Sequence, residues 1–263
     1  MIFCSLYSGS SGNSILVGSE NNRVLIDAGL SGKKIIEALD VIGENPKLIK
    51  GIFITHEHID HIKGAGIISR KFDIPIYANE LTWEAMEKSL GKISEKNIKV
   101  IGKRSLVTID DLEIQAFNTP HDSISSMGYT VRTEGKSASI VTDIGTFTEE
   151  IRQNVVDSEI ILLEANHDVE MLKFGPYPYD LKRRVLSERG HLCNEDCGNA
   201  IVELMKDNSF KNIILGHLSN TNNVPELAHK SVSNILDAKG IVLDKDLKLT
   251  VAQRNNPSNF IRI

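Results

Sequence analysis

The chain alternates short apolar runs, rich in β-branched residues, with amphipathic helical patterns over nearly its whole length. The patterns predict strands at residues 13–17, 23–26, 51–54, 74–77, 112–117, 128–131, 138–141, 160–163, 213–215 and 247–251. They predict helices at 33–39, 62–71, 80–89, 149–155, 195–206 and 226–236. Such alternation is typical of an α/β protein. Because the strands are too many for a single doubly wound sheet, we expect two sheets covered by helices.

The composition fits a globular protein with a sizeable core, since 41% of the 263 residues are hydrophobic and 25% are charged. No linker or repeat marks a boundary, so we expect a single domain over residues 1–263. The N-terminus lacks a basic signal-peptide region, and no apolar run approaches the roughly 20 residues of a spanning helix. Three cysteines, Cys4, Cys193 and Cys197, suit a reducing compartment. We therefore expect a cytoplasmic protein without membrane association.

One predicted strand, at 51–54, runs directly into a dense cluster of histidine and aspartate, His56-x-His58-x-Asp60-His61. In an extended segment residues two apart face the same side, so His56 and His58 can bind one ion. Asp60 and His61 lie at the turn into the next predicted helix and can face a second ion. A solvated helix start is the alternative interpretation, but it accounts for neither the three imidazoles nor their spacing.

Three further candidate ligands share one pattern, because each comes within a few residues of the end of a predicted strand. They are His121, Asp143 and His217. Loops at strand ends are where sites are commonly built on a rigid scaffold. One carboxylate such as Asp143 can bridge two cations about 3.5 to 4 Å apart, an arrangement that generates hydroxide near neutral pH. Taken singly each signal is weak, since a lone histidine after a strand is more often structural and a lone aspartate before glycine is usually a turn.

Together these motifs resemble the metallo-β-lactamase superfamily over essentially the whole chain. The matching residues are Leu25-Ile26-Asp27-Ala28-Gly29, the cluster from His56 to His61, His121, Asp143 and His217. The resemblance implies an α/β fold of the αββα sandwich type, with two mixed β-sheets flanked by helices. It implies a first metal ion bound by His56, His58 and His121, a second bound by Asp60, His61 and His217, and a bridge by Asp143. It also implies that Asp60 and Asp27 contribute to catalysis. Asp27 would be an acidic residue that supports the metal ligands without contacting the metal itself.

Four more segments narrow the resemblance to the YycJ/WalJ-type group, at residues 8–14, 163–167, 190–194 and 217–223. This group is associated with exonuclease action on DNA, and its relatives include phosphodiesterases and a tRNA 3′-processing ribonuclease. The resemblance implies phosphodiester hydrolysis by a metal-bound hydroxide, with DNA as the substrate and 5′ to 3′ polarity. Cys193 stands where the group's pattern has serine, a change that leaves His191 unaffected.

His191 is a candidate general acid, and it follows a basic run made of Lys182, Arg183, Arg184 and Arg189. The net charge of −5 argues against bulk electrostatic binding of nucleic acid, but a local basic patch beside His191 would suit phosphate contacts. The alternative interpretation of the basic run, without any role in binding, is a solvated helix face. The candidate substrate-binding residues are Arg183, Arg184, Arg189 and Asn220, the last from one of two His-Leu-x-Asn segments.

The leading hypothesis is a dinuclear, metal-dependent phosphodiesterase, a DNA exonuclease with nucleic acid as its partner. A first alternative is a hydrolase of small esters, thioesters or lactams, since the same set of metal ligands can support acyl transfer. A second is a non-catalytic regulatory protein stabilised by metal. The ligands suit two divalent ions, zinc or manganese, and also iron. DNA versus RNA, cleavage polarity, exo versus endo mode and oligomeric state stay open.

Three side chains and one loop have a structural interpretation as well as a functional one. His167 is as readily a structural histidine as a site residue, while Cys193 and Cys197 are more simply interpreted as small buried residues. The loop at 8–14 could bind phosphate through backbone N–H groups, although a Gly-rich hairpin turn is the safer interpretation.

Overall fold

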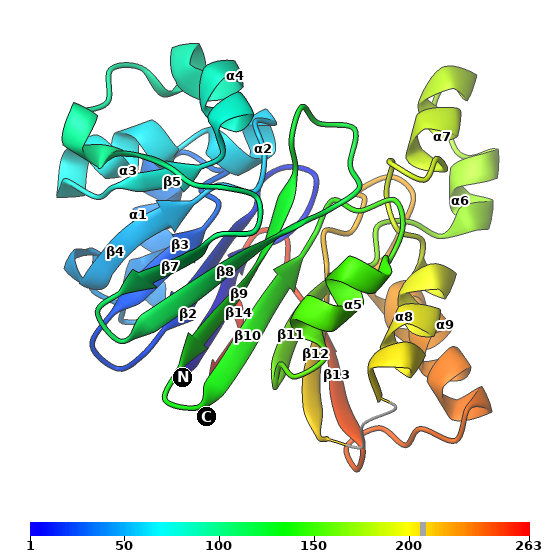
Figure 1. Cartoon of the computed structure of the whole chain (residues 1–263). Coiled ribbons are helices and arrows are strands. Elements are labelled where there is room, and N and C mark those ends of the chain that lie inside the picture. The colour runs from blue at the N-terminus through cyan, green and yellow to red at the C-terminus, as the bar shows by residue number, and fades with distance from the viewer. Residues whose placement is uncertain (206–208) are drawn as a thin grey trace.

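The computed structural model describes residues 1–205 and 209–263, and within them the chain forms two β-sheets of seven strands each (Figure 1). The first sheet has the order β14–β1–β2–β3–β4–β5–β6, made of Ser258–Arg262, Ile2–Tyr7, Ser14–Gly18, Arg23–Ile26, Ile49–Phe53, Ile76–Ala78 and Ile98–Val100. The second has the order β13–β12–β11–β10–β9–β8–β7, made of Leu247–Val251, Lys211–Gly216, Ile160–Glu164, Lys136–Val141, Met127–Thr133, Leu112–Asn118 and Leu106–Ile109.

The buried apolar side chains form three layers. One lies between the two sheets and joins residues such as Phe3 and Phe53 of the first sheet to Tyr129 of the second. The other two lie between each sheet and its covering helices. Helices α1 (Gly32–Val41), α3 (Ala65–Phe72) and α4 (Glu80–Leu90) cover the first sheet. Helices α5 (Glu149–Val155), α8 (Asn194–Leu204) and α9 (Pro225–Ala238) cover the second. The layers are therefore helix, sheet, sheet, helix.

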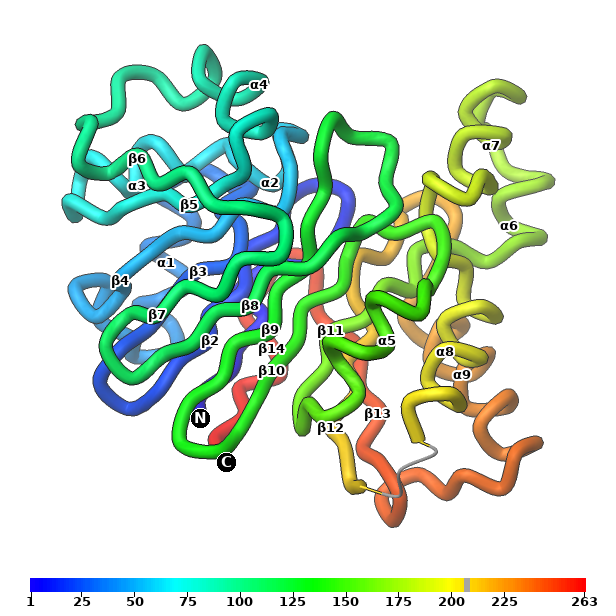
Figure 2. The backbone as a smooth tube through the Cα atoms, viewed as in Figure 1, coloured from blue at the N-terminus to red at the C-terminus, as the bar shows by residue number. Residues whose placement is uncertain are grey.

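Both sheets are mixed, and most of the candidate site residues follow strands that pair in parallel, whereas His121 follows the antiparallel strand β8. Strands β3, β4, β5 and β6 pair in parallel in the first sheet, as do β10, β11, β12 and β13 in the second. The carboxyl ends of parallel strands meet at one edge of a sheet, so the segments that follow them gather there. Figure 2 shows both chain termini at the opposite end of the sandwich, side by side.

The predicted α/β sandwich of two helix-covered sheets is confirmed, and each predicted strand overlaps an observed one. Strands β1, β6, β7 and β14 were not predicted from the sequence. The predicted helix at 62–71 is observed as α3, but its predicted start is wrong, because residue 62 belongs to a separate short helix, α2 (Ile59–Ile62). The break falls at Gly64, where a Cβ atom would lie 2.2 Å from the carbonyl oxygen of Leu30. The predicted end of another helix at Lys206 lies outside the described residues.

Two short helices, α6 (Val169–Phe174) and α7 (Tyr179–Val185), were not predicted. They follow β11 and precede α8, and Figure 1 shows them at the edge of the molecule, away from both sheets. No helix among residues 1–205 and 209–263 is long and apolar enough to cross a membrane.

Candidate metal centre

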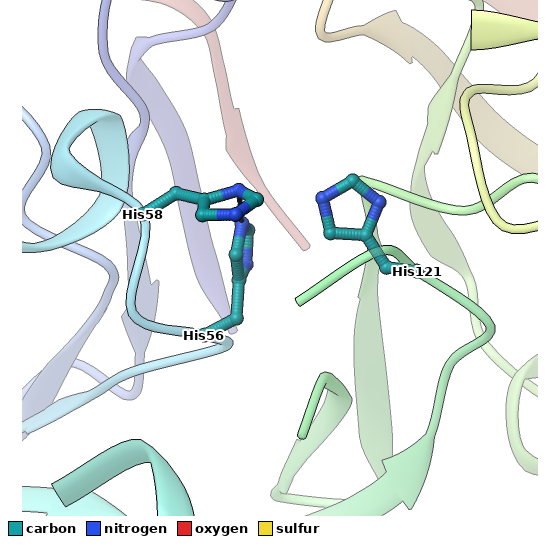
Figure 3. A group of neighbouring side chains, drawn as sticks. All are labelled: His56, His58 and His121. Atoms are coloured by element: carbon teal, nitrogen blue, oxygen red, sulfur yellow. Dashed lines mark hydrogen bonds between the residues drawn. The ribbon is translucent and has the colours of Figure 1, made fainter. Parts of the chain in front are cut away.

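Three histidines form the first group of facing side chains. His56 and His58 come from the segment after β4, and His121 comes from the loop after β8 (Figure 3). The Nε2 atom of His56 lies 3.0 Å from Nδ1 of His58, so the two residues face the same side as their spacing predicts. A donor atom of each of the three lies within 4.8 Å of the others. This group offers three imidazole nitrogens to one ion.

Asp60, His61 and His217 form the second group, and their donor atoms also lie within 4.8 Å of one another. Asp60 and His61 belong to α2, whereas His217 directly follows β12 in the other sheet. The carboxylate of Asp60 lies 3.5 Å from Nε2 of His61 and 3.7 Å from Nε2 of His217. Each sheet therefore contributes to this group.

Asp143, in the segment after β10, lies between the two groups. One of its carboxylate oxygens is 3.2 Å from Nε2 of His61, and the other is 3.8 Å from Nε2 of His121. A single carboxylate thus reaches a member of each group, which is the geometry required of a bridging ligand.

The backbone at three of these strand ends lies in the left-handed region. Asp27, Asp143 and His217 have φ angles of 61°, 55° and 53°. Residues other than glycine rarely adopt this conformation, and when they do the surrounding structure has to enforce it. At each of the three positions, the sharp turn lets the backbone leave the strand while the side chain points back across the end of the sheet.

Asp27 holds His61 from behind. Its carboxylate accepts hydrogen bonds from the backbone N–H and the hydroxyl of Thr55, at 2.8 and 2.9 Å, and lies 2.7 Å from Nδ1 of His61. Burial raises the pKa of Asp27, and the contact with His61 opposes that shift. The arrangement fixes the imidazole with Nε2 turned toward the centre, as supporting carboxylates do in metal sites.

Glu164, the last residue of β11, does the same for His217, and the sequence analysis assigned it no role. The side chain is completely buried. One carboxylate oxygen lies 2.9 Å from Nδ1 of His217 and 2.8 Å from Nδ1 of His191, and the other accepts the N–H of Ile144 at 2.7 Å. Its only sequence signal was a place at the end of a strand, inside the segment at 163–167.

His191 stands next to the two groups. Its Nδ1 faces Glu164, its side chain is 22% exposed, and the side chain of neighbouring His217 is 2% exposed. Burial opposes the imidazolium form of His191, yet Glu164 and Asp143 raise the pKa of His191 above its ordinary value. Asp143, Glu164, His191 and His217 also lie within ligand distance of one another, but both histidines already direct Nδ1 at Glu164. A partly exposed imidazole whose protonated form is favoured by the neighbouring carboxylates therefore lies beside the two groups.

The buried charges favour a cation. Burial opposes the imidazolium form of His217, yet Asp143, Asp60 and Glu164 raise its pKa to about 10. Contacts with His217 and His61 hold the pKa of Asp143 well below its usual range, against the effect of burial. The carboxylates thus attract positive charge into the centre. A divalent cation would supply that charge and displace the protons.

Two unsatisfied atoms support the same interpretation. Nε2 of His121 and Nε2 of His217 are buried and have no hydrogen-bond partner among the described residues. Buried polar atoms are nearly always paired, so such atoms require a physical reason. One atom belongs to each group of facing side chains, and a divalent ion in each group would satisfy both. The residues therefore fit metal ions with nitrogen and oxygen ligands.

Two arginines of the basic run, both exposed, contact the loop that carries His121. Arg184 forms an ion pair with Asp122, and Arg189 donates to the carbonyl oxygen of His121 at 2.8 and 3.0 Å. Both therefore help to hold the loop that carries His121. Arg183 is exposed, as is Asn220, which lies in the loop after His217. Substrate contact by these residues stays a prediction.

The loop at residues 8–14 is a hairpin connection, as predicted, and it also borders the centre, while phosphate binding by its backbone stays a prediction. It joins the antiparallel strands β1 and β2. The side-chain nitrogen of Asn13 lies 3.2 Å from Nε2 of His61, and the hydroxyl of Ser8 accepts the N–H of His217 at 2.9 Å. The loop thus contacts the second group of ligands directly.

His167, Cys193 and Cys197 are buried. Burial lowers the pKa of His167 to about 4, and both its ring nitrogens lack hydrogen-bond partners in the described part of the chain. Both thiols are free, and burial raises the pKa of Cys193 to about 12. Cys193 caps the N-terminus of α8, accepting the N–H of Asp196 at 3.4 Å. The prediction of small buried cysteines is confirmed.

Comparison with known proteins agrees with this geometry. The beta-lactamase superfamily domain matches residues 22–218. The chain is 42% identical over 239 residues to exodeoxyribonuclease YycJ of Bacillus anthracis, with 90% of each chain covered. It is 43% identical over 248 residues to exodeoxyribonuclease WalJ of Streptococcus pneumoniae, covering 93% of this chain and 91% of the relative. The metallo-beta-lactamase fold protein YhfI of Bacillus subtilis superposes with a TM-score of 0.71 at 14% identity, covering 98% of each chain.

The fold and the site define a metal-dependent hydrolase with an αββα sandwich. The chain belongs to the beta-lactamase superfamily, and it is similar to the exodeoxyribonucleases YycJ and WalJ over about nine-tenths of its length. The expected superfamily and group are confirmed.

The support that Asp27 gives to His61 yields a prediction about metal affinity. In the variant Asp27→Asn the carboxylate that orients His61 is lost, so the ion held by Asp60, His61 and His217 should bind roughly 10- to 100-fold more weakly. Calorimetric titration of the metal-free protein measures this. Asp73→Asn is a matched control, because Asp73 also has a left-handed φ, of 57°, but lies on the surface at the end of α3. Equal affinity in the wild type and Asp27→Asn would contradict the role of Asp27.

Proposed function

We propose that the chain is a nuclease that removes nucleotides from a DNA end, in the 5′ to 3′ direction, with two divalent metal ions. Its similarity to two exodeoxyribonucleases supports nucleic acid as the substrate. The observation that carries the proposal is the arrangement of two ligand groups joined by Asp143 with the pair Glu164 and His191 beside them. This arrangement offers charge stabilisation and a proton donor at one place.

His56, His58 and His121 would hold one ion, Asp60, His61 and His217 the other, and Asp143 would contact both. Zinc or manganese suits these ligands, and iron does as well. When bound, such a pair of ions supplies Lewis acidity toward a phosphodiester and lowers the pKa of water.

His191 would donate the proton that the leaving oxygen requires. Glu164 holds its Nδ1, which leaves Nε2 of this partly exposed side chain to face a substrate. The same carboxylate raises the pKa of His191 and so favours the protonated imidazole that a general acid requires. Burial of Glu164 and its three hydrogen bonds keep this pair in one orientation.

Digestion of end-labelled DNA tests the proposal. The metal-loaded protein should release labelled mononucleotides from a 5′-labelled strand at once, while a 3′-labelled strand should shorten progressively. Gel or chromatographic analysis of the products over time distinguishes release of labelled mononucleotides from progressive shortening of the labelled strand. Internal fragments from both substrates would contradict exonuclease action. Turnover of a lactam or thioester without any DNA cleavage would instead support the acyl hydrolase alternative.

Substitution of His191 tests its role as a proton donor. His191→Ala should retain full metal content and lower DNA turnover by roughly 10²- to 10⁴-fold, the range for a lost general acid. Elemental analysis and steady-state kinetics together measure this. A chromogenic phosphodiester whose phenolate leaves without protonation should be cleaved at nearly the wild-type rate. Loss of metal along with activity would make His191 a ligand.

A further inference from the structure

The segment from residue 169 to residue 185, called the arm here, contains α6, α7 and the linker between them. Figures 1 and 2 show it at the edge of the molecule, near the end of the sandwich where the loops gather. Its start is tied to the loop after His217, because the N–H of Asp168 donates to the carbonyl oxygen of Asn222 at 2.9 Å. Its end is tied to the catalytic candidate, because the N–H of His191 donates to the carbonyl oxygen of Val185 at 3.0 Å. The arm is therefore anchored at both ends to the candidate metal centre.

The arm presents aromatic rings to solvent. Phe174 is 84% exposed, more than any other large hydrophobic side chain among residues 1–205 and 209–263, and Tyr179 is 73% exposed. Only 5% of the chain is aromatic, yet the stretch from Phe174 to Tyr179, FGPYPY, holds three aromatic residues. Leu172 and Val185 are buried, so the arm has a packed inner side and the exposed rings lie outside it. Rings exposed to this extent on an anchored segment are available to a ligand.

Cations lie among these rings. The side chain of Lys182 donates to the carbonyl oxygen of Lys173 at 2.8 Å, which links the two helices. The guanidinium of Arg183 lies 5.9 Å from the centre of the Tyr179 ring, and it has no ion-pair partner in the described ranges. Arg184 connects the arm to Asp122, the neighbour of His121. Cationic side chains thus extend from the exposed rings toward the loop that carries a candidate ligand, where Asp122 balances the charge of Arg184.

We propose that the arm binds unpaired nucleotides of the substrate strand, with bases stacked on Phe174 and Tyr179 and phosphates contacted by Lys182 and Arg183. This inference rests on the proposed nuclease function. Exposed aromatic rings interleaved with cations are how proteins bind single strands without sequence preference, because every base offers a flat face and every linkage a negative charge. A base within a duplex is already stacked and paired, so its face is not accessible to a ring. The arm therefore selects single-stranded or frayed ends over blunt duplex ends.

Binding measured in the presence of a chelator tests the arm without any contribution from turnover. The probe is a fluorescently labelled oligothymidine strand, compared with the same strand in which abasic sites replace successive bases. The variants are Phe174→Ala, Tyr179→Ala and the double substitution. Phe260→Ala is the matched control, since Phe260 is an aromatic residue 46% exposed on β14.

Removal of each ring should weaken binding of the intact strand by roughly 5- to 150-fold, the loss associated with one stacked base. The wild type should bind the abasic strand more weakly than the intact strand, and the double variant should bind both about equally. Phe260→Ala should behave as the wild type. Hydrolysis of a chromogenic phosphodiester should be unchanged in every variant, which excludes a general loss of folding.

Two results would overturn the inference. One is unchanged affinity of the double variant for the intact strand, and the other is an equal loss of affinity for the intact and abasic strands, which would make the rings structural. If the wild type releases nucleotides from DNA and either result is found, the arm is excluded while the nuclease function stands. If the wild type cleaves no DNA at all, the proposed function itself fails.

Discussion

Two buried carboxylates, Asp27 and Glu164, determine the geometry of the candidate metal centre. Each holds Nδ1 of a histidine at 2.7 to 2.9 Å and so fixes the direction of the opposite nitrogen. A buried carboxylate without partners would be costly, so both accept hydrogen bonds, from Thr55 in the segment after β4 and from Ile144 in the segment after β10. Glu164 also holds His191. The same carboxylate therefore orients His217, a candidate ligand of the second metal ion, and His191, the proposed proton donor.

The sandwich determines how these carboxylates come to face one another. Asp27 follows β3 in one sheet and Glu164 ends β11 in the other, and the apolar layer between the sheets fixes the distance between them. Left-handed turns at Asp27, Asp143 and His217 then direct side chains across the end of both sheets. Packing of the apolar interior therefore sets the positions of the polar groups at the centre.

The two groups of candidate ligands could be predicted from the sequence because they follow apolar strands, and because a metal site accounts for the spacing of the histidines from His56 to His61. Glu164 could not, since its role depends on β11 lying between β10 and β12, a pairing between distant segments. The same holds for β14, which becomes a strand by pairing with β1 at the other end of the chain. The break between α2 and α3 depends on the approach of Leu30 to Gly64, which is also non-local.

The central claim is that two ions occupy one centre and share Asp143. Anomalous diffraction from crystals grown with manganese, recorded on both sides of the metal absorption edge, tests it most directly. We expect two peaks, one among His56, His58 and His121 and the other among Asp60, His61 and His217, each within bonding distance of the Asp143 carboxylate. A single peak at this centre, in protein that is fully active in solution with the same metal content, would contradict the account.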